Sequence, residues 1–163
     1  MKCVNLPNLL RAIGVALLAF APASADAQSV RINKLANAAF GTISNFTSDN
    51  TRSQNVCVYS TAPSGLYHIT ATGSGSGGAF TLASGANTMA YEVQWAATTG
   101  QTSGTSLTSG VALTGLTSNA TASGCTSVPL TSASLITILR TAVVGAAKSG
   151  SYSGTLTLLV APN

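Results

Sequence analysis

The sequence predicts an all-β protein, folded as an antiparallel β-sandwich or barrel. Three observations favour this class. Thr, Val, Ile and Tyr, which suit the half-buried surface of a strand, are frequent, whereas the helix formers Glu, Lys and Gln are scarce. Several short segments alternate apolar and polar residues with a period of two. Clusters of Gly, Ser and Pro separate these segments, as turns do in sandwiches and barrels.

The first element along the chain is an export signal. Lys2 and Arg11 supply positive charge, and residues 12–20 (AIGVALLAF) are apolar but too short to span a bilayer. Small residues follow, and we expect cleavage after Ala27, with cleavage after Ala25 as the alternative. Residues 1–27 are therefore predicted to be a secretory signal peptide, and no later segment predicts a transmembrane helix.

The rest of the chain, residues 28–163, is predicted to be a single domain without internal repeats. It contains two cysteines, Cys57 and Cys125, because Cys3 leaves with the signal peptide. An even number of cysteines in an exported chain predicts one disulfide. Closing so long a loop would stabilise the fold by roughly 4 kcal/mol. Two free, buried thiols are the alternative.

Three strands are expected in the first half of the domain. Alternation predicts them at residues 55–60 (NVCVYS), 66–72 (LYHITAT) and 79–83 (AFTLA). Pro63, Ser64 and Gly65 form the turn between the first two strands, and a glycine-serine loop precedes the third.

Residues 89–95 (MAYEVQW) carry the most regular alternation in the chain. Met89, Tyr91, Val93 and Trp95 share one apolar face, and we expect this face to be core. Trp95 as a platform for stacking sugars is the alternative. The core position is favoured because Trp95 is in phase with the other apolar residues.

Three more strands complete the expected set. Residues 106–116 alternate weakly, and residues 135–144 (LITILRTAVV) form a continuous apolar run that is typical of a buried strand. The last strand covers residues 152–160, and no helical period occurs after the signal peptide. The apolar face of the last strand consists of Tyr152, Leu156, Leu158 and Val160.

Charge is sparse, and this excludes several classes of protein. Charged residues make up 6% of the chain, with a net charge of +4, whereas an average soluble protein has about 25%. Coiled coils, charge-rich helix bundles and acidic disordered tails are therefore excluded. A nucleic-acid-binding surface is not expected either, because phosphate binding requires clustered cations.

Few residues are suited to catalysis. The single histidine, His68, falls on the polar face of a strand among threonines, where we expect it to be solvated. Asp49 and Glu92 are the only carboxylates after the signal peptide, and the chain has no GxSxG motif. Calcium sites need several convergent carboxylates, and one histidine with two cysteines is a poor zinc set. We therefore expect no enzymatic activity, no cofactor and no metal site.

The order of five short segments resembles the spore coat protein U family, which includes the pilins of archaic chaperone-usher pili. A Phe-Gly strand end corresponds to residues 39–42 (AFGT), and a cysteine-bearing strand corresponds to residues 56–58 (VCV). Two strands with tyrosines follow at residues 67–73 (YHITATG) and 89–93 (MAYEV). The chain ends with a Gly-x-Tyr-x-x-Thr strand at residues 150–158 (GSYSGTLTL).

The first strand departs from the family pattern. Many family members carry another cysteine there, but residues 30–35 (VRINKL) have none, so that Cys57 pairs with Cys125. A pilin of a polymeric rod also needs a donor segment of alternating apolar residues before its first strand. Val30 and Ile32 begin such a pattern and are the candidate donor segment, although Lys34 interrupts it.

The resemblance implies an incomplete immunoglobulin-like sandwich that lacks its last strand. The face formed by Tyr152, Leu156, Leu158 and Val160 would then line a polymerisation groove beside an open sheet edge. The implied partners are a periplasmic chaperone, an usher and neighbouring pilin subunits, in a chain exported through the periplasm to a surface pilus (fimbrium) that serves cell adhesion or biofilm formation. The alternative is a stand-alone secreted β-sandwich that binds a glycan or a cell surface through its loops.

Overall fold

The computed structural model describes residues 27–163, so residues 1–26 of the predicted signal peptide lie outside the described residues. No helix in the described part is long and apolar enough to cross a membrane. The strands and the helix, in chain order, are β1 (Val30–Asn33), β2 (Asn50–Ser60), β3 (Leu66–Gly73), β4 (Thr81–Ser84), β5 (Asn87–Ala90), β6 (Glu92–Ala96), β7 (Thr105–Ser106), β8 (Ala112–Thr117), β9 (Ala133–Leu139), α1 (Thr141–Ala146) and β10 (Leu156–Pro162).

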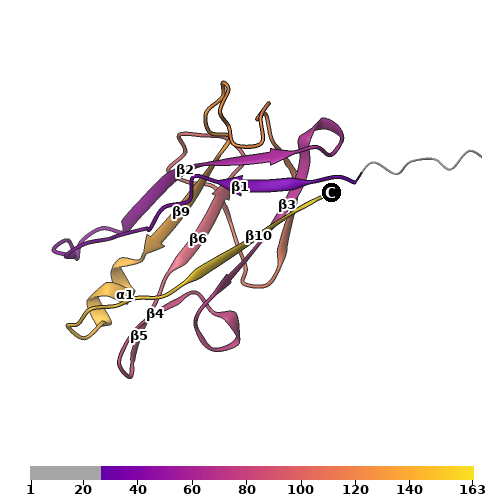
Figure 1. Cartoon of the computed structure of the whole chain (residues 1–163). Helices are drawn as coiled ribbons and strands as arrows, with labels where there is room; N and C mark the ends of the chain where they lie inside the picture. Colours follow the sequence, from indigo (N-terminus) through magenta and orange to yellow (C-terminus); the bar gives the residue numbers. More distant parts are fainter. Residues whose placement is uncertain (1–26) are drawn as a thin grey trace, which may run out of the picture.

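The strands form two antiparallel sheets and a separate hairpin (Figure 1). The larger sheet has the order β1-β2-β9-β6-β7, and the smaller sheet has the order β10-β3-β8. β4 and β5 form a two-stranded ladder with each other and belong to neither larger sheet. The predicted all-β, antiparallel sandwich is confirmed.

The hydrophobic core lies between the two sheets. Trp95 of β6 and Tyr67 of β3 are 1% and 0% exposed, and the indole Nε1–H of Trp95 donates a hydrogen bond to the Tyr67 hydroxyl across 3.0 Å. Val56, Val58 and Ile69 are fully buried around them. Trp95 is therefore a core residue, as its phase in the sequence predicts, and not a surface platform for sugars.

The expected strand over residues 89–95 is divided between two sheets. β5 pairs with β4, whereas β6 pairs with β9, and Tyr91 stands between them. The N–H of Tyr91 donates to the carbonyl of Phe80 across 2.9 Å. Met89 and Tyr91 are nevertheless buried, because the alternation of side chains continues through the crossing.

The prediction of a strand over residues 135–144, without any helix, was wrong beyond Leu139. β9 ends at Leu139, and α1 follows at once. Asp49 caps this helix: its Oδ1 accepts hydrogen bonds from the N–H of Thr141 (2.9 Å) and from the Thr141 hydroxyl (3.1 Å). A carboxylate at a helix N-terminus is stabilising. The two residues are 92 positions apart, so no local pattern indicates the cap.

The last strand begins later than its alternation predicts. β10 starts at Leu156, and the chain before it is fixed by a single bridge, in which Ser153 and Ala83 exchange backbone hydrogen bonds of 2.8 and 3.0 Å. Leu159, on the outer face of β10, is 62% exposed. The half-buried residues of β10 that pack on the core are Leu156, Leu158 and Val160.

The disulfide joins the core to a long loop. Cys57 of β2 is bonded to Cys125, with 5.9 Å between their Cα atoms, and both residues are buried. The Nζ of Lys34 donates to the carbonyls of Cys125 (3.3 Å) and Leu130 (2.6 Å). The residues after β1 and the loop between β8 and β9 are thus held together.

Candidate strand-binding groove

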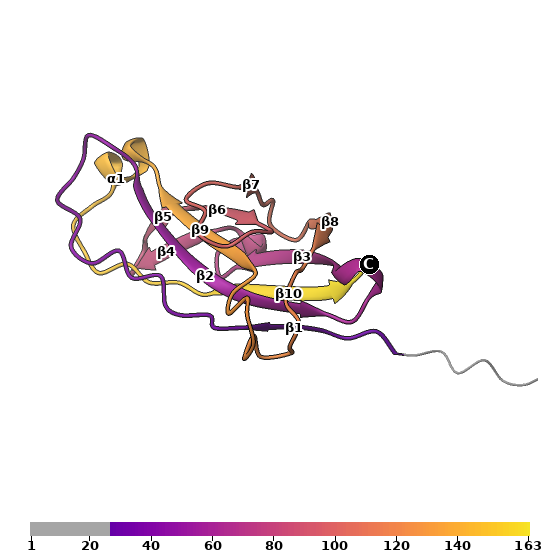
Figure 2. The same ribbon diagram turned by 90° about the horizontal axis from the view of Figure 1, so that it is seen from above.

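A large groove opens along one side of the sandwich. Its volume is about 1360 Å³, and it lies between two stretches of chain that are not paired with each other. One wall is residues 35–43, which we call the strap, and the other is residues 147–158. Figure 2 shows both walls running toward the end of the molecule that carries α1.

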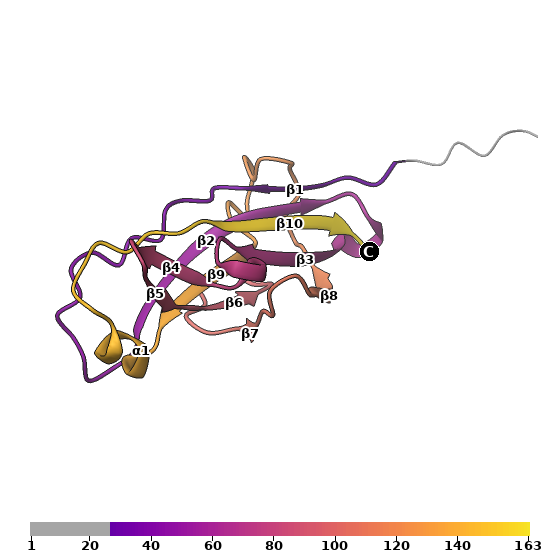
Figure 3. The ribbon, with the colours of Figure 1, turned by 90° about the horizontal axis from the view of Figure 1, so that it is seen from below.

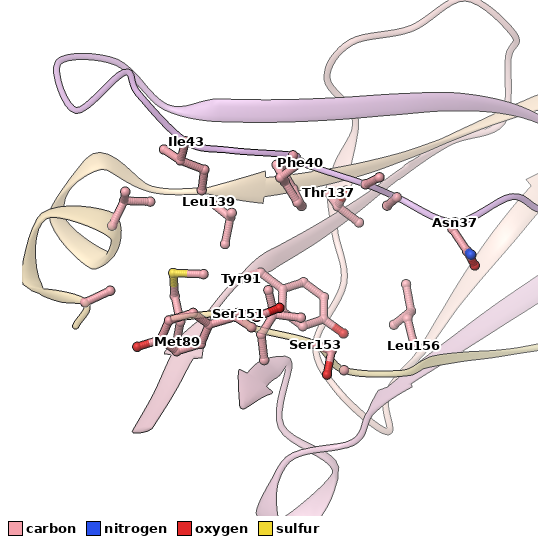
Figure 4. A pocket seen from close by; sticks show the side chains of 18 of the residues that line it. Asn37, Phe40, Ile43, Met89, Tyr91, Thr137, Leu139, Ser151, Ser153 and Leu156 are labelled. Carbon is pink, nitrogen blue, oxygen red and sulfur yellow. The ribbon is translucent and has the colours of Figure 1, made fainter. Parts of the chain in front are cut away.

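The floor of the groove is apolar and comes from the core. Leu135, Thr137 and Leu139 occupy alternate positions of β9 and line the groove. Met89 and Tyr91 lie opposite Thr137 and Leu139 (Figure 4). Each of these five side chains is at most 8% exposed. A strand presents alternate residues on one face. An extended chain with apolar residues at every second position could therefore pack its apolar side chains on this floor.

The strap forms the first wall without joining a sheet. Phe40 and Ile43 are half-buried and point into the groove (Figure 4). Arg52 of β2 holds the strap: its Nε donates to the carbonyl of Ala39 (2.9 Å) and its Nη2 to that of Phe40 (3.2 Å). The guanidinium also lies 5.9 Å from the centre of the Phe40 ring, which is a cation–π distance.

Gln54 of β2 fixes the strap at a second point. Its Oε1 accepts a hydrogen bond from the N–H of Ala36 (2.8 Å), and its Nε2 donates to the carbonyl of Ala36 (3.1 Å). The side chains of Arg52 and Gln54 thus attach the strap to β2, in place of a ladder of backbone hydrogen bonds. The strap belongs to no described strand, so no backbone ladder occupies its main-chain groups.

The second wall leads into β10. The Tyr152 hydroxyl donates to the carbonyl of Lys148 (2.9 Å), and the N–H of Thr155 donates to the Ser74 hydroxyl (3.0 Å). Leu156 follows as the first residue of the strand and points into the groove (Figure 4). This wall is therefore held by few hydrogen bonds before β10 begins.

The edge strands of the two sheets are neighbours, and β10 is the one that contributes to the groove lining. β1 pairs only with β2, and β10 pairs only with β3, so each is the outermost strand of its sheet. β1 and β10 lie side by side (Figure 1, Figure 3), but no ladder joins them in the described part of the chain. Open edges expose main-chain donors and acceptors that can pair with a further strand.

The structure places most of the predicted groove residues at this site. Tyr152, Leu156 and Leu158 line the groove, whereas Val160 lies beyond the lining, packs on the core and pairs with Ile69. Phe40, Ile43 and Leu139 also line the groove, and no pattern in the sequence identified them as groove residues. The motif at residues 39–42 lies within the strap and was noticed in the sequence. The sequence did not indicate that this segment lies opposite the last strand across a groove.

The candidate donor segment is paired within its own chain. Val30 and Ile32 belong to β1, opposite Ser60 and Val58 of β2. Both side chains are half-buried and pack against the core. In this structure the segment therefore completes the larger sheet rather than extending free of the domain.

Charges gather at one place outside the groove. Arg140 binds Glu92 through its Nη2 (2.5 Å to Oε2) and Asp49 through its Nη1 (2.7 Å to Oδ2). The hydrogen bond from Arg140 lowers the pKa of Glu92 below its ordinary value. The pKa of Asp49 is also lowered, first by the backbone hydrogen bond from Thr141 and then by that from Arg140. Both acidic side chains of residues 27–163 are thus engaged.

The side chains that could serve catalysis or metal binding do not form a cluster within the described residues. His68 is half-buried in β3, and its Nδ1 lies 3.0 Å from the Oδ1 of Asn163. Within residues 27–163, no three His, Cys, Asp or Glu side chains are grouped so that they could hold a metal ion. The groove lining of this same part of the chain contains neither histidine nor carboxylate.

Comparison with known proteins gives a likeness of fold. No protein-family model matches the chain, and no curated protein matches it. A solved structure described as a chaperone–tip adhesin complex in the biogenesis of CFA/I fimbriae contains a similar chain, with a TM-score of 0.50 and 17% sequence identity. The likeness covers 82% of this chain and 41% of that one, so this protein spans less than half the length of the chain it matches. The two chains share a fold that occurs in a fimbrial chaperone–adhesin complex.

Proposed function

We propose that this protein is a structural subunit of a chaperone-usher type surface pilus, or an accessory to one. In this role it is not an enzyme, and it assembles by accepting an extended strand in its groove. The observation that carries the proposal is the groove itself, with an apolar floor between the strap and the open edge strand β10. Its partners would be a periplasmic chaperone first, and then an usher and neighbouring subunits.

Strand addition follows from the physical chemistry of the site. An incoming strand would bond to the free main-chain groups of β10 on one side and of the strap on the other. Its inward side chains would pack on Leu135, Leu139 and Met89, which lie beneath the opening. Left uncovered, the open edge of β10 beside an apolar groove favours aggregation. A chaperone that occupies the groove before assembly would prevent it.

Two further observations support the pilus assignment. The fold is shared with a chain from a fimbrial chaperone–tip adhesin complex. The Cys57–Cys125 disulfide suits an oxidising compartment such as the periplasm or the cell surface. The finer assignment, to the spore coat protein U family, rests on the order of the five segments from residue 39 to residue 158.

The proposal is tested by adding a synthetic peptide with apolar residues at alternate positions. We expect the purified protein to gain thermal stability with this peptide and not with a scrambled one, because only the first can fill the apolar floor while pairing with β10 and the strap. The variant Leu158→Asp should lose the gain, since a carboxylate would be buried in the groove. Leu159→Asp is the matched control, because Leu159 is on the exposed face of the same strand.

The opposite outcome favours a different function. A protein that is a stable monomer and gains nothing from any alternating peptide or chaperone would have a complete sandwich. The stand-alone secreted binding module would then replace the pilus subunit. Val128 and Leu130, which are 83% and 56% exposed in the loop held by the disulfide, would be its first candidate contacts.

A further inference from the structure

We propose that the strand accepted by the groove comes from a different polypeptide and carries an acidic residue where it passes Lys148. This inference rests on the proposed function, because it specifies the partner of the same groove. It follows from the distribution of charge around the groove and from the state of the chain's own first strand.

The groove has one charged residue in its lining. Within the described part of the chain, Lys148 is the single ionisable cation among the residues that form its walls and floor, and no carboxylate is among them. Lys148 is exposed and follows α1, so it marks the α1 end of the groove. The residues next to it in the wall, 149–151, are Ser, Gly and Ser and offer no opposite charge.

Within residues 27–163, no acidic side chain is left to pair with Lys148. In residues 27–163 the two acids are Asp49 and Glu92, and both are bound to Arg140. Arg52, which holds the strap, adds a second positive charge beside the groove. An acidic side chain on the incoming strand would therefore meet a complementary potential, and a basic one would be repelled.

A second copy of this chain is a poor source of the strand. Its alternating segment contains Arg31 between Val30 and Ile32 and is followed by Lys34. Donated to the groove, this segment would bring like charges to a positive rim. This segment is also already engaged within its own domain. β1 pairs with β2, and the Lys34 ammonium donates to two carbonyls of the disulfide loop. Donation would require these contacts to break, whereas a strand from another protein carries no such cost.

The test compares peptides that differ only in charge. Two peptides share the same alternating apolar residues. Near both ends, the outward-facing positions are Glu in the first peptide and Lys in the second. A third peptide has the sequence of residues 28–36. Binding to the purified protein is measured by fluorescence anisotropy at low and high salt. We expect the Glu peptide to bind about threefold to tenfold more tightly than the Lys peptide at low salt. The difference should shrink at high salt.

Substitutions then assign the preference to Lys148. Lys148→Gln should remove most of the difference between the two peptides, and Lys148→Glu should reverse it. Arg31→Gln is the matched control, because it removes one exposed cation that does not line the groove and should leave the preference intact. An equal effect of both substitutions would mean attraction by net charge, and the inference would be overturned.

The remaining outcomes separate this inference from the proposed function. If the Glu and Lys peptides bind equally and both stabilise the protein, the groove accepts a strand and the charge preference is wrong. If the peptide of residues 28–36 binds as tightly as the Glu peptide, the partner is a second copy. If no peptide stabilises the protein, the proposed function itself fails.

Discussion

The hydrogen bond between the two sheets allows a direct test of how the core is built. Replacing Tyr67 by Phe removes the hydroxyl that accepts the Trp95 indole N–H at 3.0 Å, while the ring and its packing remain. Trp95 is 1% exposed and Tyr67 is fully buried, so water cannot take the place of the lost acceptor. A buried donor left without a partner costs about 1–3 kcal/mol. For a domain of this size, the melting temperature should fall by several degrees.

Urea unfolding measures this loss, and Tyr59→Phe is the control. Tyr59 is half-buried in β2, and its hydroxyl has no hydrogen-bond partner within the described residues. We expect the control to change the free energy of unfolding by no more than about 0.5 kcal/mol. Burial raises the pKa of Tyr67 to about 12, so the native protein should also lose stability as the pH rises above about 10, and Tyr67→Phe should lose less. Equal stability of the two variants would refute the interpretation.

Two other predictions concern the covalent and ionic links of the fold. Reducing the Cys57–Cys125 disulfide should lower the free energy of unfolding by roughly 4 kcal/mol on the loop-entropy model. Thiol labelling of the denatured, unreduced protein should find no free cysteine. Two labelled cysteines would contradict the disulfide. The pKa values of Asp49 and Glu92 are lowered in the folded state, so their stabilisation is present above the unfolded values near pH 4 and is lost as the pH falls through the folded ones. Urea unfolding between about pH 6 and pH 2 should show this loss in the native protein and a smaller one in Arg140→Gln; identical pH profiles would argue against it.

The alternation of side chains was sufficient to predict the class of the fold and much of its core. A period of two places Met89, Tyr91, Val93 and Trp95 on one face, and all four are buried. This works because alternation is a local property of an extended chain. The sheet to which a strand belongs is not local, and for this reason the division between β5 and β6 at Tyr91 could not be seen in the sequence.

The helix illustrates the same limit for local structure. Residues 141–146 are apolar enough to continue a strand, and they lack a capping side chain next to them. The folded chain supplies the cap from Asp49, which Arg140 holds in place through an ion pair. The conformation of this segment therefore depends on a residue 92 positions away.

For the candidate site, the sequence determined the apolar face of the last strand. Leu156 and Leu158 were identified by their alternation, which requires only neighbouring residues. The tertiary structure alone decided that residues 35–43 form the opposite wall, that β9 provides the floor, and that β1 and β10 are both edges. The physical reason is that a groove is a relation between segments distant in the chain, and the strap is held there by side chains of β2 rather than by any pattern of its own.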